Sequence, residues 1–247
     1  MTGLAGLRSE FDNRFRGTTA VIRQRLDQYV GILDLGSLGR LGTAVDLGCG
    51  RGEWLDLLAD HHVPAYGVEL DDDVAAGART RGHDIRAEDA LAHLREVATG
   101  SLGLVTMFHL AEHLPFGTLL EVLREAHRTL ASGGVLVVET PNPTNLVVGA
   151  SSFYIDPTHL RPLPPELLEF LGTAAGFESV QVVPLNPPAV PPFSPPASLA
   201  GDAAMERLVA ELNRVLLGPM DAALIATKDS RYTGVPVAGA GADGVVI

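Results

Sequence analysis

The sequence has one cysteine and one lysine among its 247 residues, and no apolar run approaches the length of a membrane-spanning helix. A single cysteine excludes an internal disulfide framework. The absence of long apolar runs and of a signal-peptide core predicts a protein without a membrane partner, located in the cytoplasm.

Basic residues are also few. The chain carries 18 Lys and Arg against 30 Asp and Glu, which gives a formal net charge of −12. Such a surface repels nucleic-acid phosphates and anionic membranes unless a local basic patch overrides the net charge. Because the arginines are scattered, we expect no nucleic-acid partner.

Strand and helix patterns alternate along the chain, which predicts an α/β fold with a mostly parallel sheet covered by helices on both faces. Residues 1–40 are expected to be helical, 41–228 to form the domain, and 229–247 to be a flexible tail. A proline-rich stretch and an amphipathic helix interrupt the domain at 186–218. An insertion of this length is functional or an interface, so it is expected either to cap the substrate site or to form a homodimer surface. The predicted strands are 41–47, 64–70, 84–89, 102–108, 135–139, 180–185 and 222–227.

The most informative motif follows the first predicted strand and reads D-x-G-x-G-x-G from Asp46 to Gly52. A dinucleotide fingerprint would place its third glycine at position 53, where this chain has Glu53. Glycines let a ligand approach the backbone, and an acid beside the turn suits a ligand that carries an amine. This pattern resembles motif I of the S-adenosylmethionine (SAM)-dependent methyltransferases. Cys49, inside the motif, is interpreted as a packing residue.

That resemblance implies further cofactor-binding residues beside Asp46, Gly48 and Gly50. Glu69 ends the second predicted strand, where it can accept both ribose hydroxyls. Asp89 resembles the acid that meets the adenine amino group, with Glu88 as its near rival. Arg25 and Arg16 are candidates for the cofactor's carboxylate, and a purely structural role is equally open for both.

A second group of polar residues begins where the fourth strand ends. His109, Glu112 and His113 can point into one cavity if the segment turns helically, and the loop that contains His159 opens onto the same sheet edge. Two imidazoles and a carboxylate can bind a divalent metal, and a histidine that is not a ligand can act as general base. The alternative is an acid–histidine pair that only orients the next helix.

These residues resemble known metal-dependent methyltransferases. The four-residue set is similar to the metal site of small-RNA 2′-O-methyltransferases, which have glutamate in place of His109, and Glu112-His113 also resembles the quinone O-methyltransferases. The closest resemblance is to sugar-acting enzymes: the methyltransferase part of O-antigen chain terminators and the methylmannose polysaccharide 1-O-methyltransferases. It covers most of residues 10–180 and includes the run from Asp156 to Leu168.

The resemblance implies a Rossmann-like seven-stranded class I methyltransferase sheet and metal-assisted transfer to a carbohydrate hydroxyl, most concretely the 1-OH of a methylated mannoside. Small RNA, a quinone ring and a SAM-binding scaffold without catalysis remain alternatives. The implied catalytic residues are His109, His113 and His159, and Tyr154, Asp156 and Arg161 are expected to shape the acceptor pocket. The resemblance implies Mg²⁺ (or Mn²⁺), whereas histidine ligands favour manganese or zinc.

Overall fold

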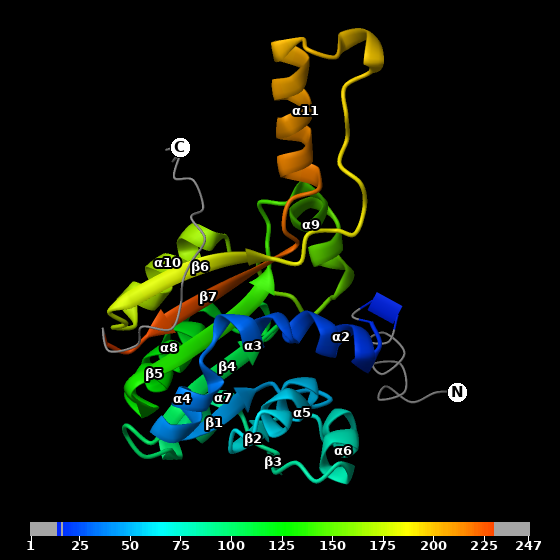
Figure 1. The fold of residues 1–247 in the computed structure, drawn as a ribbon. Helices are drawn as coiled ribbons and strands as arrows, with labels where there is room; N and C mark the ends of the chain where they lie inside the picture. Colours follow the sequence, from blue (N-terminus) through cyan, green and yellow to red (C-terminus); the bar gives the residue numbers. More distant parts are fainter. Residues whose placement is uncertain (1–13, 16, 230–247) are drawn as a thin grey trace.

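The computed structural model describes residues 14, 15 and 17–229, and within them it contains one seven-stranded sheet (Figure 1). The order across the sheet is β3-β2-β1-β4-β5-β7-β6, which confirms the predicted Rossmann-like seven-stranded α/β fold. The strands are β1 (Thr43–Leu47), β2 (Ala65–Val68), β3 (Ile85–Arg86), β4 (Leu102–Phe108), β5 (Leu130–Pro141), β6 (Ser179–Leu185) and β7 (Asp221–Thr227).

Strand direction decides which residues meet at the functional edge of the sheet. The strands from β3 to β5 run parallel to their neighbours, whereas β7 is antiparallel to both β5 and β6. Asp221, the first residue of β7, therefore pairs with Pro141, the last residue of β5. The start of β7 and the ends of the parallel strands lie at one edge.

Helices cover both faces of the sheet, because each helix presents an apolar stripe to it. In α8 (Phe116–Thr129), for example, four apolar residues recur at helical spacing and are all buried: Leu119, Val122, Leu123 and Ala126. The same core contains residues of α7 (Ala90–Glu96) and α10 (Pro165–Ala174). The opposite core is formed with α2 (Thr19–Leu26), α3 (Gln28–Ile32), α4 (Leu35–Leu41), α5 (Glu53–Asp60) and α6 (Asp72–Thr80).

Several element boundaries differ from the sequence prediction. From residue 17 onward the N-terminal helical segment is divided into α2, α3 and α4. The Asp34 side chain accepts from Ser37 N at 3.0 Å and starts α4. β5 begins at Leu130 rather than at residue 135, because Leu130 already pairs with Leu102 of β4. The predicted strand 84–89 shrinks to β3, because Asp89 caps α7. The tail from residue 230 onward lies outside the described residues.

The 186–218 insertion, called the arm below, projects from the sheet edge (Figure 1). It contains an irregular outgoing segment (186–196), the 3-10 turn η3 (Ala197–Leu199) and the helix α11 (Ala203–Leu216), in which no residue is buried. The Asn213 side chain joins α11 to the outgoing segment, accepting from Phe193 N at 2.7 Å and donating to Phe193 O at 3.0 Å. None of the helices in the described part of the chain is both long and apolar enough to cross a bilayer.

Two glycines test the packing of α4 on the sheet. A Cβ at Gly103 in β4 would lie 2.0 Å from Leu38 O, whereas a Cβ at Gly117 in α8 would have no atom within 4 Å. Gly103→Ala is therefore expected to lower the free energy of unfolding by about 3 kcal/mol. Gly117→Ala is expected to raise it by up to about 1 kcal/mol, because alanine favours a helix. Urea denaturation of both variants measures this, and equal effects would contradict the packing described.

Candidate functional site

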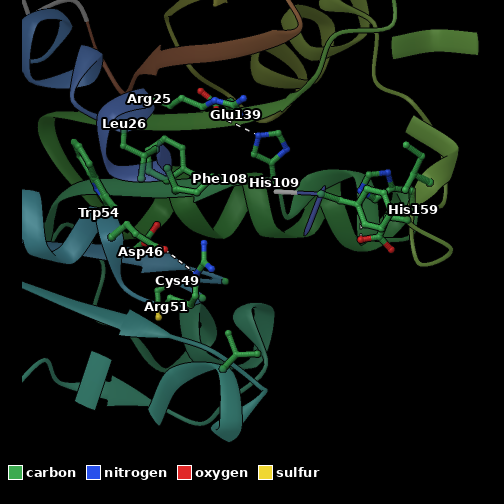
Figure 2. A pocket seen from close by; sticks show the side chains of 18 of the residues that line it. Arg25, Leu26, Asp46, Cys49, Arg51, Trp54, Phe108, His109, Glu139 and His159 are labelled. Carbon is green, nitrogen blue, oxygen red and sulfur yellow. Dashed lines mark hydrogen bonds and ion pairs between the residues drawn. The ribbon is translucent and has the colours of Figure 1, made fainter. Parts of the chain in front are cut away.

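The carboxyl edge of β1, β4 and β5 borders a cavity of about 260 Å³, called the main cavity below. It extends from the glycine turn after β1 to the 151–160 loop, and Figure 2 shows its side chains. The position agrees with the rule that ligands of open α/β sheets bind beyond the carboxyl ends of the strands. Its lining includes Phe15, Ile22, Arg25, Leu26, Asp46, Gly48, Cys49, Gly50, Arg51, Glu53, Trp54, Val74, Phe108, His109, Glu139, Ser152, Ile155, Asp156 and His159.

The glycine turn forms one end of the main cavity. Gly50 has φ 54°, and a Cβ there would meet only Gly48 O at 4.0 Å, so the cavity begins at bare backbone. Asp46 is buried and accepts from Thr106 Oγ1 at 2.7 Å. Burial raises the pKa of Asp46 to about 8. This end combines open backbone with a carboxyl group, which fits a ligand that carries an amine.

The Cys49 thiol packs against β2. A Cβ on Gly67 of β2 would lie 2.4 Å from Cys49 Sγ, so the sulfur fills the space above that glycine. Burial raises the pKa of the thiol, which disfavours the reactive thiolate. Both observations agree with a packing role.

Of the other predicted cofactor residues in the described part of the chain, only Arg25 lines the main cavity. Arg16 lies outside the described residues. Glu69 accepts from Gly50 N and from Asp71 N, both at 3.0 Å, and each oxygen retains a second lone pair for a ribose hydroxyl. Asp89 Oδ1 accepts from Leu91 N and Ala92 N as the cap of α7. The adenine role of Asp89 stays a prediction.

The N-terminal helices close the cofactor end. Tyr29 of α3, Trp54 of α5 and Phe108 of β4 form an aromatic cluster with ring centroids 5.1 to 6.1 Å apart. Arg51 of the glycine turn donates to Gly17 O at 3.0 Å. The turn is therefore attached directly to the segment that precedes α2.

His109 lies between acidic side chains rather than beside the other histidines. Its Nδ1 is 3.2 Å from Glu112 Oε1, and its Nε2 is 3.2 Å from Glu139 Oε1 and 3.7 Å from Asp221 Oδ1. Partial burial lowers the pKa of His109, but hydrogen bonds to Glu112 and Glu139 outweigh it and hold that pKa well above the usual value. This raised pKa favours the imidazolium form of His109, which donates from both ring nitrogens. The sequence predicted that His109 would converge with Glu112, His113 and His159. In the structure, His109 instead forms a separate possible ligand group with Glu139 and Asp221.

Glu112, His113 and His159 do converge, with one ligand atom of each within 4.8 Å of the others. His159 Nδ1 lies 2.6 Å from Phe153 O, and because a carbonyl only accepts, this nitrogen donates. In the neutral form of His159 the proton-free nitrogen is therefore Nε2, which lies 3.9 Å from Glu112 Oε1.

A hydrogen-bonded chain fixes His113 in the same way. Thr158 Oγ1 donates to Asp156 Oδ1 at 2.5 Å and accepts from His113 Nδ1 at 2.9 Å. In the neutral form of His113, Nε2 is then the nitrogen without a proton. Two imidazoles whose tautomers are set by neighbouring oxygens, together with a carboxylate, are typical of a metal site.

The three predicted acceptor residues lie in different places. Asp156 lines the main cavity, and its hydrogen bonds from Thr158 overcome burial to keep its pKa low. Tyr154 is 63% exposed and packs edge-on against Phe153. The Arg161 guanidinium lies over the Phe116 ring at 4.9 Å. Of the three, only Asp156 is among the described residues that line the main cavity.

Sequence reasoning missed Glu139, Asp221 and Tyr29. Glu139 accepts from the Tyr29 hydroxyl on one oxygen and contacts His109 with the other. Asp221 accepts from Asn186 Nδ2 at 2.8 Å. The available signal was position, since Glu139 interrupts an apolar strand near its end and Asp221 stands at the start of another.

The strand order and the glycine turn define a class I SAM-dependent methyltransferase domain. The chain belongs to the methyltransferase-domain family, whose model matches residues 20–182. A SAM-dependent methyltransferase structure from Archaeoglobus fulgidus superimposes with a TM-score of 0.79 at 28% identity, covering 89% of this chain and 99% of that one.

Curated relatives match a shorter stretch. A probable SAM-dependent methyltransferase from Mycolicibacterium smegmatis is 35% identical over 137 residues, 54% of this chain and 51% of that protein. A trans-aconitate 2-methyltransferase from Rhizobium meliloti is 36% identical over 116 residues, 43% of each chain. The chain thus spans about half the length of the curated relatives it matches.

The raised pKa of Asp46 has a measurable consequence. A folded-state pKa of about 8 against an ordinary 3.8 means that Asp46 contributes stability below pH 3.8, which is lost as pH rises to about 8. Asp46→Asn carries no charge and escapes this loss. The unfolding free energy of the variant relative to the natural protein should therefore rise between pH 5 and pH 9, measured by urea denaturation. A difference that stays constant across this range would contradict the buried carboxyl described.

Proposed function

We propose that the protein transfers the methyl group of SAM to a carbohydrate hydroxyl with the help of a divalent cation. The most concrete acceptor is the 1-OH of a methylated mannoside. The observation that carries the proposal is the cluster of Glu112, His113 and His159, of which His159 lines the main cavity. It adds a metal-binding donor set to a cofactor fold, which a SAM-binding scaffold without catalysis does not need.

The donor chemistry fits a divalent cation. Glu112 is fully buried, and its hydrogen bond from His109 outweighs burial to keep its pKa low, so it is a carboxylate. His113 and His159 would supply their proton-free Nε2 atoms. When bound, a cation lowers the pKa of a coordinated hydroxyl and fixes its position. Two imidazoles suit Mn²⁺ on ligand preference, whereas the sugar-enzyme resemblance favours Mg²⁺.

The chain's own residues divide the remaining work. The raised pKa of His109 disfavours it as the base that takes the acceptor's proton, and we assign it the role of orienting Glu112 and Glu139. His159 Nε2 can accept that proton where it is not a ligand. Asp46 and the glycine turn would hold the amine end of SAM, which brings the two reactants together.

The charge of the site supports a neutral acceptor. Glu53, Glu139 and Asp156 line the main cavity together with Arg25, Arg51 and His109, and the raised pKa of Asp46 favours its neutral form. The lining thus has no excess of positive charge for RNA phosphates, which the net charge of −12 also disfavours, and it tolerates a polyhydroxyl compound. A bacterial Hen1 methyltransferase domain superimposes with a TM-score of 0.55 at 15% identity, which supports the fold and not the acceptor.

Transfer of tritiated methyl from SAM to short mannosides tests the proposal. The natural protein should label a mannoside, and EDTA should abolish the labelling. His159→Ala should lower the rate at least about 100-fold without weakening SAM binding, because it removes a predicted cation ligand. His61→Ala, an exposed histidine at the end of α5, is the matched control.

Three outcomes would contradict parts of this proposal. Full activity in EDTA would show that the reaction does not need a divalent cation. Labelling of an oligoribonucleotide or a quinone precursor while mannosides stay unlabelled replaces the acceptor. SAM binding with no product across a glycan panel supports a non-catalytic scaffold.

Thr158 tests how His113 is oriented. Thr158→Val removes the hydroxyl between Asp156 and His113 and should weaken Mn²⁺ binding about 10- to 100-fold, whereas Thr158→Ser should retain it. Titration of Mn²⁺ followed by electron paramagnetic resonance measures both variants. Equal affinity in the two would show that the hydroxyl does not set the imidazole.

A further inference from the structure

A second cavity of about 150 Å³, called the side cavity below, adjoins the main one. The two share Phe15, Arg25 and Ser152. Residues that line only the side cavity include Asn186, Met220 and Asp221, which lie where the arm leaves and rejoins the sheet. The arm therefore begins and ends at the side cavity.

We propose that the side cavity binds a second sugar ring of an oligosaccharide acceptor, next to the ring that is methylated. The inference rests on the proposed carbohydrate acceptor and extends it to acceptor length. It gives the two ends of the arm a binding role.

The polar groups of the side cavity are prearranged for hydroxyl groups. Asn186 Nδ2 donates to Asp221 Oδ2 at 2.8 Å, and Gln28 Nε2 of α3 donates to Asn186 Oδ1 at 3.2 Å. Amide and carboxylate groups retain further hydrogen-bonding positions, and the Arg25 guanidinium adds donors. A few fixed polar groups beside an apolar wall are typical of small-ligand sites, and a sugar ring offers a hydroxyl rim and an apolar face to match.

Phe153 and Asp221 connect the side cavity to the proposed chemistry. The Phe153 ring lines the side cavity, and its centroid is 4.6 Å from that of the His159 ring. Asp221 Oδ1 is 3.7 Å from His109 Nε2. A ring in the side cavity would thus lie one side chain away from His159, as adjacent rings of one acceptor require.

Backbone strain marks the same place. Three non-glycine residues in the described part of the chain have positive φ: His62 at 56°, His109 at 52° and Asn186 at 54°. His109 and Asn186 both contact Asp221. Strained backbone persists where the surrounding structure fixes it and clusters at functional sites.

The positive φ of Asn186 allows a clean test. Asn186→Gly removes the amide while keeping a backbone conformation that glycine adopts readily. The measured quantity is kcat/KM for mannobiose divided by kcat/KM for mannose, because both sugars carry the free 1-OH that a methyl glycoside lacks. The natural protein should prefer the disaccharide, and Asn186→Gly should reduce the ratio about tenfold, the effect of losing one or two hydrogen bonds. The matched control is His62→Gly, which removes an exposed side chain at the same φ and should leave the ratio unchanged.

Calorimetric titration of the protein with mannobiose, without SAM, gives a readout independent of catalysis. Binding that weakens about tenfold in Asn186→Gly and not in His62→Gly supports the side cavity. Equal kcat/KM for both acceptors in the natural protein, or an unchanged ratio in Asn186→Gly, would overturn the inference while leaving the carbohydrate proposal intact. Failure of every glycan to be labelled while another acceptor is would reject the proposed function itself.

Discussion

The candidate site depends on one imidazolium among buried carboxylates. Glu112, Glu139 and Asp221 are 0%, 3% and 7% exposed, and each contacts His109. Charges this far from water destabilise the fold unless they are paired. His109 supplies that pairing through both ring nitrogens. Its backbone N–H donates to the backbone carbonyl oxygen of Glu139 at 2.9 Å. The positive φ at His109 is the conformation in which its side chain reaches all three acids.

The same acids connect the N-terminal helices to the part of the main cavity that contains His109. Tyr29 donates to Glu139, and Gln28 donates to Asn186, so two neighbouring residues of α3 contact the polar network around Asp221. On the cofactor side, Arg51 donates to Gly17 O. The N-terminal segment from Gly17 to Tyr29 thus contacts both the glycine turn and the acids around His109. Movement of this segment would disturb both ends of the main cavity together.

Local patterns predicted the parts of the molecule that depend on local chemistry. The alternation of apolar runs gave the strands, and the glycine spacing located the turn beside Asp46. Glu112, His113 and His159 were identified because each falls in a short polar segment after a strand. The grouping of His109 was not predictable, since it depends on a backbone angle of 52° that an ordinary histidine rarely adopts. Asp221 was missed because its position depends on the pairing of β7 with β5, 80 residues apart along the chain.

Because β7 is antiparallel to β5, both ends of the arm lie at the functional edge of the sheet, on the other side of β4 from the glycine turn. In the parallel strands, only residues at the end of a strand reach the functional edge. Because β7 runs the other way, its first residue lies there, and so does Asn186 at the end of β6. Both ends of the arm therefore meet at the side cavity. Lengthening a connection changes its closure entropy only slowly, so the arm can differ in size or composition while Asp46 and the glycine turn, on the far side of β4, keep their geometry.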